Sequence, residues 1–315
     1  LLGRKTLMRV HGGNFREYYN QSSPMIQRWI RNGAGLNNRV ITASPQMYDT
    51  WRMIGLPESK LVHIGNAVDL PAISNPRSVI ARRQRSSGGE AIPSSLVNSP
   101  KTRGLLPEGR NDGIQELSLV GNIESKSSDH PREKITILFL TRIVFAKGII
   151  ELIDAGCNLH AQSDAFELRI VGAEELETTR IKEMLAVRNA DYIEYVGPVS
   201  EAQKEDEYRR ADVFAFPTHV EDQSYAVMEA MSYGLACAAS DVGGVPSLIQ
   251  NEVNGLLIPP KNVDALADAL DRLARSSELR ARLGSSARRT IEENFGWERR
   301  AREMKELYEA VMSET

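Results

Sequence analysis

The sequence predicts an α/β protein built on a doubly wound parallel sheet. In its C-terminal half, short apolar runs, several rich in β-branched residues, alternate with stretches that have helical spacing. Each run is closed by Gly, Pro, Ser or Thr, as expected for strands that are buried on both faces. The length of 315 residues is enough for about two domains. The alternation implies right-handed crossovers between parallel strands.

The C-terminal half accounts for most of the expected elements. We expect strands at residues 135–141, 166–172, 192–197, 212–217 and 235–240, with helices at 148–160 and 174–188 among them. Beyond Asp241, two turn clusters surround a short strand, charged helices follow, and an amphipathic helix at 297–313 ends the chain. In such sheets ligands bind at the carboxyl ends of the strands. The residues that follow each strand are therefore the candidates for a site.

The sequence of the N-terminal part predicts a second, smaller group of alternating strands and helices. We expect strands at residues 6–10, 39–44 and 60–65, and helices at 24–31 and 45–54. This set is too small to bury a satisfactory core alone. The predicted domains are residues 1–75, a disordered linker or insertion at 76–134, the complete sheet domain at 135–297, and a helix at 298–315 that packs back toward the N-terminal domain. Because the chain begins LLGRKT, without Met, we expect an N-terminally truncated sequence.

Charge and cysteine content narrow the choice of compartment and partner. Residues 1–75 carry nine Lys and Arg against four acids, although the whole chain has a net charge of −3. A basic N-terminal part could face anionic substrates or a membrane surface, or it could be an ordinary solvated surface. Cys157 and Cys237 have no neighbours at metal-ligand spacing, and no apolar run approaches the ~18 residues of a membrane span. We expect a cytoplasmic protein with a peripheral membrane contact as an option, and no nucleic-acid partner.

Two cations follow the expected strand at residues 135–141. Arg142 and Lys147 stand five residues apart in TRIVFAKG and lead into a helix. At this place the two cations and the helix N-terminus can converge on one anion. A diphosphate suits this geometry, because Arg offers a bidentate fork and Lys a point charge. The alternative is solvated charge at a helix end.

Two acids, Glu221 and Glu229, lie in the stretch EDQSYAVMEAMSYG. Eight helical steps would leave their side chains about 80° apart, so they do not share one line on a helix. We expect Glu221 in a loop and a helix that starts near Ser224, with Ser224 or Asp222 as its cap. The backbone N–H groups at 223–225 would then point to the ligand. Two acids beside an anion-binding helix end suit a polyol that carries a phosphate, whereas the alternative is one acid near the helix N-terminus and one exposed acid.

These motifs, taken in order, resemble glycosyltransferase family 4, the glycosyl transferases group 1. The pattern Arg142–x4–Lys147–Gly148 is followed by Glu221–x7–Glu229. Other matching segments are RVHGGNF (9–15), VHIGNAVDL (62–70), LRIVG, YVGPVS, RRADVFAFPT and VGGVPSLIQNEVNGLLIPP. The resemblance covers nearly the whole chain outside residues 76–134.

The resemblance implies a GT-B fold, in which two Rossmann-like domains face a cleft. Here the N-terminal, acceptor-side domain would be incomplete and the C-terminal, donor-binding domain complete. It further implies a hexosyltransferase that uses a nucleotide-sugar donor, UDP- or GDP-linked, and retains the anomeric configuration. The acceptor would be a glycan, a lipid or a small molecule, as in polysaccharide biosynthesis. No cofactor and no metal are implied.

The resemblance also assigns roles to the candidate residues. Arg142 and Lys147 would hold the diphosphate, Glu221 would bind sugar hydroxyls, and His11 would reach the donor sugar; these four are the expected catalytic residues. The expected donor-binding residues are Pro198, Val199, Gln223, Ser224, Tyr225 and Glu229. Pro198 and Val199 would contact the base, and Glu229 the ribose.

Several positions depart from the family pattern. Asp222 and Ser224 stand where glycines are common, which stiffens the loop and adds an acid near the expected phosphate. Two other functions therefore stay open. One is a sugar-nucleotide epimerase or hydrolase on the same fold, and the other is a binder of nucleotide-sugars without catalysis.

Overall fold

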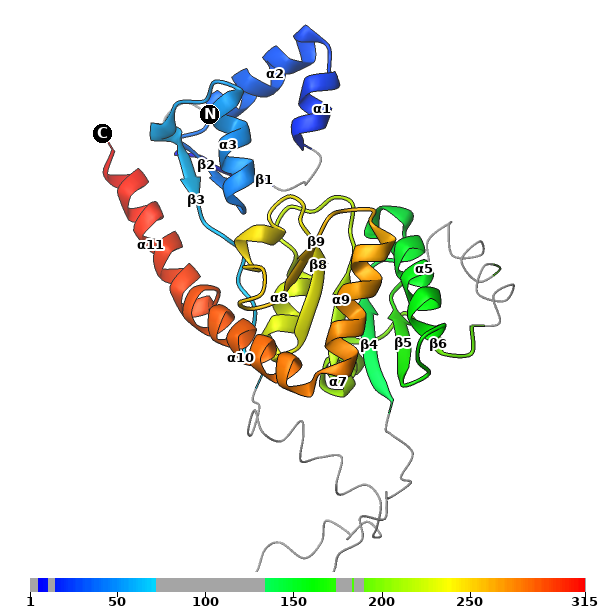
Figure 1. Cartoon of the computed structure of the whole chain (residues 1–315). Coiled ribbons are helices and arrows are strands. Elements are labelled where there is room, and N and C mark those ends of the chain that lie inside the picture. The colour runs from blue at the N-terminus through cyan, green and yellow to red at the C-terminus, as the bar shows by residue number, and fades with distance from the viewer. Residues whose placement is uncertain (1–4, 11–14, 72–133, 174–182, 184–189, 315) are drawn as a thin grey trace, which may run out of the picture. The chain divides into compact units, whose positions relative to one another are not determined.

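The computed structural model describes residues 5–10, 15–71, 134–173, 183 and 190–314. Within these ranges the chain forms two parallel sheets, one of three strands and one of six (Figure 1). The expected segment 76–134, apart from Lys134, and the helix expected at 174–188, apart from Glu183, lie outside the described residues. The described part therefore tests the two α/β sets and leaves the connecting segment as a prediction.

The N-terminal sheet has the order β1-β2-β3, from strands Leu7–Val10, Arg39–Thr42 and Leu61–His63. Helices α1 (Phe15–Gln21), α2 (Pro24–Gly35) and α3 (Pro45–Met53) and a 3₁₀ turn at Glu58–Lys60 connect the strands. Both α2 and α3 start with a serine cap followed by proline, a pairing that satisfies one free N–H and presets the first φ angle. The three strands and the helices α2 and α3 were expected, whereas α1 was not.

The C-terminal sheet has the order β6-β5-β4-β7-β8-β9, all parallel. Its strands are β4 (Ile135–Leu140), β5 (Phe166–Val171), β6 (Ile193–Gly197), β7 (Val213–Phe216), β8 (Ala236–Ser240) and β9 (Leu256–Ile258). Each expected strand is confirmed to within one residue at either end. In this order the chain starts at the centre and reverses direction between β4 and β7, which makes that pair the topological switch point.

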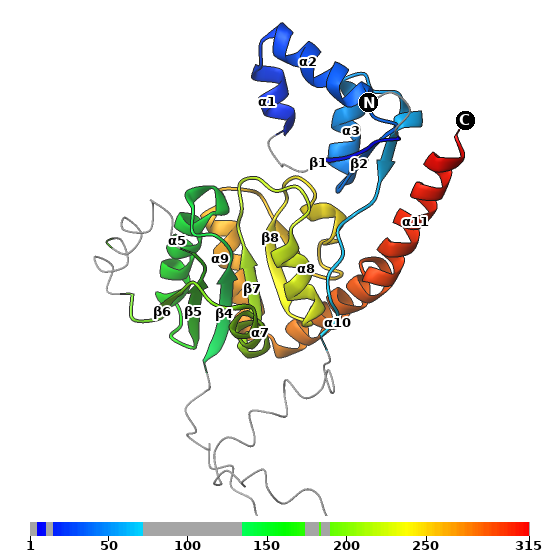
Figure 2. The same ribbon diagram turned by 180° about the vertical axis from the view of Figure 1, so that it is seen from behind.

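Helices cover both faces of this sheet. Helices α5 (Ile149–His160) and α9 (Val263–Arg275) lie on the face seen in Figure 1, and α8 (Tyr225–Ser232) lies on the face seen in Figure 2. Helices α7 (Glu201–Arg210) and α10 (Ser277–Asn294) contribute buried residues to the same core as α8. The sheet is therefore buried on both sides, which explains why its strands read as continuous apolar runs.

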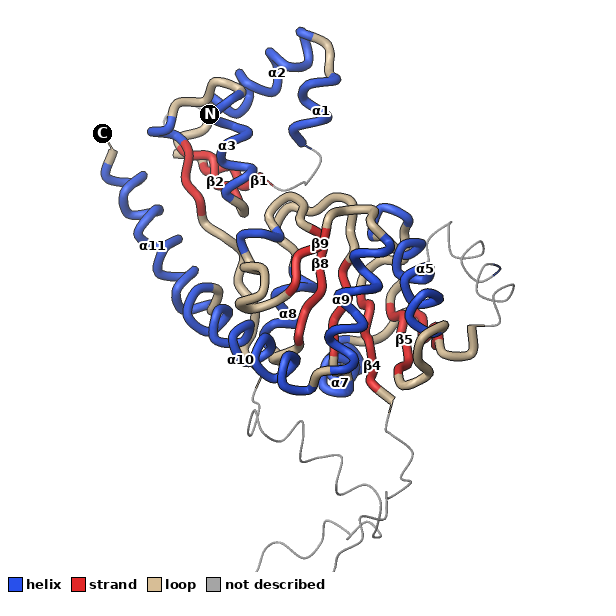
Figure 3. The backbone as a smooth tube through the Cα atoms, viewed as in Figure 1, coloured by secondary structure: helices blue, strands red, loops and turns tan. Residues whose placement is uncertain are grey.

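Helix α11 (Trp297–Ser313) follows α10 after a break at Phe295 and Gly296. Figure 3 shows the two helices in succession. Its residues Leu307 and Val311 pack in one cluster with Ile41 and Ile64 of the N-terminal part. Trp297, at the first position of α11, is 54% exposed and does not belong to this cluster. The apolar i, i+4 pair deeper in the helix makes the contact, because residues four apart share one helical face.

Of the two cysteines, Cys237 is fully buried in the core of the larger sheet and Cys157 is half-buried. Burial raises the pKa of the Cys237 thiol well above its usual range, so this thiol stays protonated. Cys157 accepts a hydrogen bond from the hydroxyl of Tyr192 at 3.1 Å. Both cysteines are packing residues. Among the described helices, none is long and apolar enough to cross a membrane.

Candidate active site

The loops that follow β4 and β7 meet at the switch point of the larger sheet. The loop after β4 ends in the 3₁₀ turn Phe145–Lys147 and in Gly148, which caps α5 with a positive φ of 77°. The carbonyl of Ala146 accepts hydrogen bonds from the His219 N–H at 2.9 Å and from the Thr218 hydroxyl at 3.2 Å. The two loops that carry the predicted cations and the first predicted acid are thus joined to each other.

Gly148 permits this contact, and a substitution there tests it. A Cβ at this position would lie 1.9 Å from the carbonyl oxygen of Pro217. We expect Gly148→Ala to destabilise the fold by roughly 2–4 kcal/mol, combining left-handed strain with overpacking. Gly197→Ala is the matched control, since Gly197 has a φ of 84° but no atom within 4 Å of the added Cβ. In urea unfolding, equal losses for the two variants would contradict a role for the loop contact.

Lys147 and Glu221 form an ion pair at this junction. The Nζ of Lys147 donates to Oε2 of Glu221 at 2.7 Å, and the two side chains are only 15% and 17% exposed. The Lys147 ammonium also lies 5.4 Å from the centre of the Phe216 ring. Glu221 lies in the loop after β7, as expected. The sequence singled out both residues but did not predict that they touch. Arg142, at the start of the same loop as Lys147, is exposed.

Helix α8 starts beside this pair and carries the second acid. Ser224 is its N-cap and accepts from the Val227 N–H, which confirms the predicted helix start and cap. The first N–H groups of α8 have no partner within the helix, because of helix geometry. Glu229 lies in the second turn of α8, where its carboxylate accepts from Lys204 at 2.8 Å and from the Tyr208 hydroxyl at 2.9 Å.

Asp222 and Gln223 contact the N-terminal part of the chain. Asp222 is buried and accepts a hydrogen bond from the Ser44 hydroxyl, the residue that caps α3. The side-chain oxygen of Gln223 accepts from the Asn66 N–H, and the Asn66 amide donates to the Gln223 carbonyl at 3.1 Å. An anion near a helix N-terminus is favourable, which explains how Asp222 is tolerated in this loop. The sequence expected Asp222 near a phosphate, whereas its Oδ1 is bound to Ser44.

The remaining predicted site residues differ in their exposure to solvent and in whether the structure describes them. Pro198 is exposed after β6, and Val199 is half-buried against the core cluster to which α8 contributes. Tyr225 is 49% exposed at the first position of α8, and Ser224 is buried as its cap. His11 lies outside the described residues, so its role stays a prediction.

Sequence reasoning missed several residues that shape this region, namely Ser44, Asn66, Glu151, Lys204 and Tyr208. His219 belongs to the same region, where its ring Nε2 lies 2.9 Å from Glu151 Oε1. The one usable signal was the i, i+4 spacing of Lys204 and Tyr208 in a helix that directly follows a strand. The other contacts join residues distant in sequence, which no local pattern reveals.

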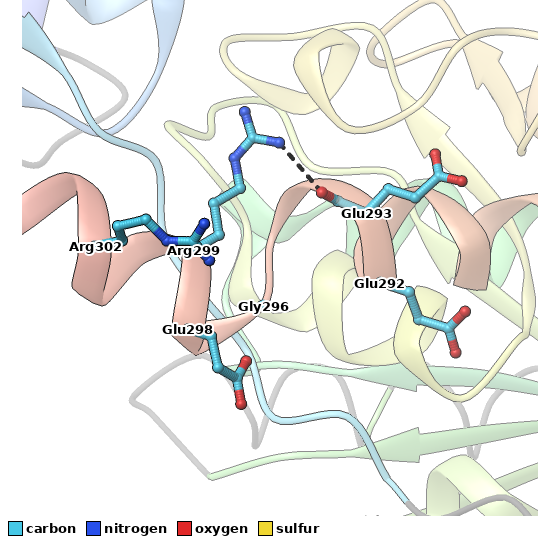
Figure 4. A pocket seen from close by; sticks show the side chains of 6 residues that line it. All are labelled: Glu292, Glu293, Gly296, Glu298, Arg299 and Arg302. Carbon is cyan, nitrogen blue, oxygen red and sulfur yellow. Dashed lines mark hydrogen bonds between the residues drawn. The ribbon is translucent and has the colours of Figure 1, made fainter.

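A separate hollow lies at the junction of α10 and α11 (Figure 4). It has a volume of about 430 Å³ and is lined by Glu292, Glu293, Gly296, Glu298, Arg299 and Arg302. Arg299 donates across it to the main-chain oxygen of Glu293 at 3.2 Å. None of the strand-end residues lines this hollow, and its walls are charged rather than apolar. Ligand sites usually combine apolar walls with a few polar groups, so the switch point is the better candidate.

The acids near the switch point do not form a metal cluster. Within the described ranges, no group of three or more His, Cys, Asp or Glu side chains could hold a metal ion. The acids there are paired instead with a lysine, a tyrosine, a histidine or a serine. These pairings favour recognition of a polar, anionic ligand through hydrogen bonds and charge.

The protein has a doubly wound α/β fold, and two loops meet at the switch point of its larger sheet. One loop carries the cations Arg142 and Lys147, and the other carries the acid Glu221. The chain belongs to the family described as glycosyl transferases group 1, whose pattern matches residues 122–290. The fold is of the GT-B type, which the two parallel α/β regions and the structural neighbours support.

Individual relatives agree with this assignment. The chain is 31% identical over 182 residues to the D-inositol 3-phosphate glycosyltransferase of Xylanimonas cellulosilytica, covering 56% of this chain and 43% of that protein. It is also 31% identical over 230 residues to the phosphatidyl-myo-inositol mannosyltransferase of Mycobacterium leprae, covering 70% of this chain and 60% of that protein. The chain thus spans about half the length of these two relatives.

Among solved structures, the Anabaena protein HepE in complex with UDP and glucose superposes with a TM-score of 0.69 at 17% identity, covering 97% of this chain and 72% of that one. At this identity the likeness concerns the fold alone.

Proposed function

We propose that this protein transfers a hexose-type sugar from a nucleoside diphosphate sugar to an acceptor. The observation that carries the proposal is the Lys147–Glu221 pair at the switch point, beside the N-terminus of α8. A lysine at the start of a helix can bind a diphosphate, and a neighbouring carboxylate can accept hydrogen bonds from sugar hydroxyls. Membership of the glycosyl transferases group 1 supports the same reading.

In this proposal each residue has one task. Arg142 and Lys147 bind the diphosphate and stabilise the charge that develops on it as the bond to the sugar breaks. Glu221 holds sugar hydroxyls, Glu229 holds the ribose, and the segment at Pro198 and Val199 contacts the base. The backbone N–H groups at Gln223, Ser224 and Tyr225, where α8 begins, face the phosphates, and His11 reaches the sugar from the N-terminal part.

The proposed reaction retains the configuration at the anomeric carbon. The bond from that carbon to the diphosphate oxygen breaks, and both electrons leave with the diphosphate. The acceptor hydroxyl then bonds to the same face of the carbon, and its proton passes to the departing phosphate oxygen. Support for this route is the ion pair itself, because a carboxylate held by Lys147 at 2.7 Å is a weaker nucleophile than a free one.

The donor in this proposal is UDP- or GDP-linked, and neither a cofactor nor a metal takes part. The cations Arg142 and Lys147 supply the positive charge that a metal would otherwise provide. The printed names of the relatives point to inositol- or glycan-type acceptors for those proteins, and we carry over only the general class, a glycan, a lipid-linked acceptor or a small polar molecule.

The experiment is a transfer assay on the full-length protein. UDP- and GDP-linked hexoses are offered with a panel of sugar, inositol and lipid acceptors, and NMR reports the anomeric configuration of the product. Transfer with retention is the expected result. Turnover without any acceptor would favour the epimerase or hydrolase function, and nucleotide binding without turnover would favour the non-catalytic binder.

The proposal includes a peripheral contact with an anionic membrane on the cytoplasmic side. On α2, the exposed side chains of Met25 and Trp29 (79% and 76%) stand beside Arg28 and Arg31, which are also exposed. Aromatic and apolar side chains flanked by arginines suit an anionic lipid surface. Sedimentation with phosphatidylglycerol vesicles is expected at low salt and should weaken at high salt. No binding at any salt concentration would remove this part of the proposal.

A further inference from the structure

Helix α7 presents two donors to one carboxylate on α8. Lys204 and Tyr208 stand four residues apart and therefore lie on one face of α7. Lys204 Nζ donates to Oε1 of Glu229 at 2.8 Å, and the Tyr208 hydroxyl donates to Oε2 of the same residue at 2.9 Å. Each oxygen of Glu229 thus has its own protein donor.

Lys204 is held between two acids. Its ammonium also contacts Oε2 of Glu201 at 2.7 Å, and its side chain is 22% exposed. Burial lowers the pKa of Lys204, but the hydrogen bonds to Glu201 and Glu229 outweigh it, so the pKa is raised overall. Lys204 therefore stays charged at neutral pH. The Glu201 side chain is 88% exposed, so the contact with Glu229 is the more sheltered of the two.

Tyr208 is fixed more firmly than Lys204. It is 1% exposed, and its ring stacks on that of Tyr233 with centroids 5.2 Å apart. Burial, followed by the charge of Glu229, raises the pKa of Tyr208 well above its usual range. The hydroxyl thus remains a donor at any working pH. Because the ring is buried and stacked, its hydroxyl defines where Oε2 of Glu229 lies.

This arrangement leaves the carboxylate able to bind a ligand. A carboxylate has about four acceptor sites, and the two protein donors occupy two of them. The Glu229 side chain is 27% exposed, so its free acceptor sites remain accessible. A vicinal diol, such as the 2′- and 3′-hydroxyls of ribose, can donate to both oxygens at once, provided that the carboxylate keeps one orientation. The donors on α7 supply that orientation.

We propose that Lys204 and Tyr208 are positioning residues that hold Glu229 to accept both ribose hydroxyls, and so make the site prefer ribonucleotides over 2′-deoxyribonucleotides. The inference rests on the proposed function, which places the ribose at Glu229. Lys204 and Tyr208 need not touch the ligand themselves. A carboxylate that is free to turn would still bind one hydroxyl, but it would lose the advantage of the second.

Calorimetry on the full-length protein with UDP, GDP and their 2′-deoxy forms tests this. For the base that the site recognises, the wild type is expected to bind the ribonucleotide more tightly than the 2′-deoxyribonucleotide. Lys204→Met and Tyr208→Phe should each weaken ribonucleotide binding about tenfold, as loss of one hydrogen bond to a charged group does, and change binding of the deoxy form much less. The ratio of the affinity for the ribonucleotide to that for the deoxy form therefore falls in these variants. In Lys204→Arg, which keeps a cation at this position, most of the wild-type ratio should remain.

Two substitutions serve as controls. Glu201→Gln removes the exposed partner of Lys204, and Lys305→Met removes an exposed lysine paired with Glu309 on α11. Both should keep the wild-type ratio. Folding of every variant is checked by circular dichroism.

The outcomes separate the inference from the function on which it rests. Folded Lys204 and Tyr208 variants that keep the wild-type ratio, or that weaken both nucleotides equally, would overturn the positioning role and leave the proposed function standing. A wild type that binds none of the nucleotides, or a Glu229→Gln variant that binds them as well as the wild type, would overturn both.

Discussion

Replacing Lys147 with alanine is expected to lower kcat/KM for sugar transfer by about 10²–10³, since one lost contact to developing charge costs roughly 2.7–4 kcal/mol. Lys147 is the sheltered cation at the switch point, and its partner Glu221 would be left without its charge. Steady-state kinetics with the preferred donor measure the effect. Stability should change much less than activity, because both side chains keep some contact with solvent.

The matched control for this variant is Lys305→Ala. Lys305 is 74% exposed and lies 3.8 Å from Glu309 in an i, i+4 pair, an interaction that is worth little at a surface. It should keep wild-type kinetics. A Lys147→Ala enzyme that stays within twofold of the wild type would rule out the diphosphate role for Lys147.

The largest expected loss of stability follows from Arg169→Ala, at about 3–5 kcal/mol. Arg169 on β5 donates to both oxygens of Glu207 on α7, at 2.8 and 2.9 Å, and both side chains are 7% exposed. The hydrogen bond to Glu207 is the main cause that raises the pKa of Arg169. Removing the arginine leaves the buried carboxylate of Glu207 without its two short hydrogen bonds, and its other partner, the exposed Arg210, lies 4.0 Å away. A buried carboxylate with so little compensation is the costly situation. Urea unfolding measures the change.

Two further variants separate the buried pair from ordinary surface charge. Arg209→Ala breaks an exposed pair with Glu205 on the same helix and should lower the urea midpoint far less than Arg169→Ala does. The double variant Arg169→Met with Glu207→Leu should recover most of the loss, because an apolar pair leaves no unpaired charge. If the double variant were less stable than Arg169→Ala alone, the unpaired-charge explanation would be wrong.

The same buried pair bears on the site. Helix α7 carries Glu207 on its inner face and also carries Lys204 and Tyr208, which hold Glu229. Arg169 therefore anchors to the sheet the helix that orients the second acid. The segment FELRIVG predicted a strand, and the arginine within it gave no hint that it would be buried.

The loop acid Asp222 shows where local reasoning stops. In the sequence, Asp222 departs from the family pattern next to Glu221 and adds negative charge near an expected phosphate. In the structure its carboxylate accepts from Ser44, more than 170 residues earlier in the chain, and one of its oxygens is buried without a partner among the described residues. Asp222 thus contributes a contact between the loop after β7 and the start of α3.

The sequence alone determined the parallel strands, the start of α8 at Ser224, and the separation of Glu221 and Glu229 into a loop and a helix. These features follow from local rules, namely apolar runs closed by turn residues, a serine cap and the 3.6-residue helical period. Only the tertiary structure decided which residues meet: Lys147 with Glu221, Arg169 with Glu207, Lys204 and Tyr208 with Glu229, and Ser44 with Asp222. Each of these contacts joins residues at least 21 positions apart, and it depends on strand order and helix packing, which leave no periodic trace in the sequence.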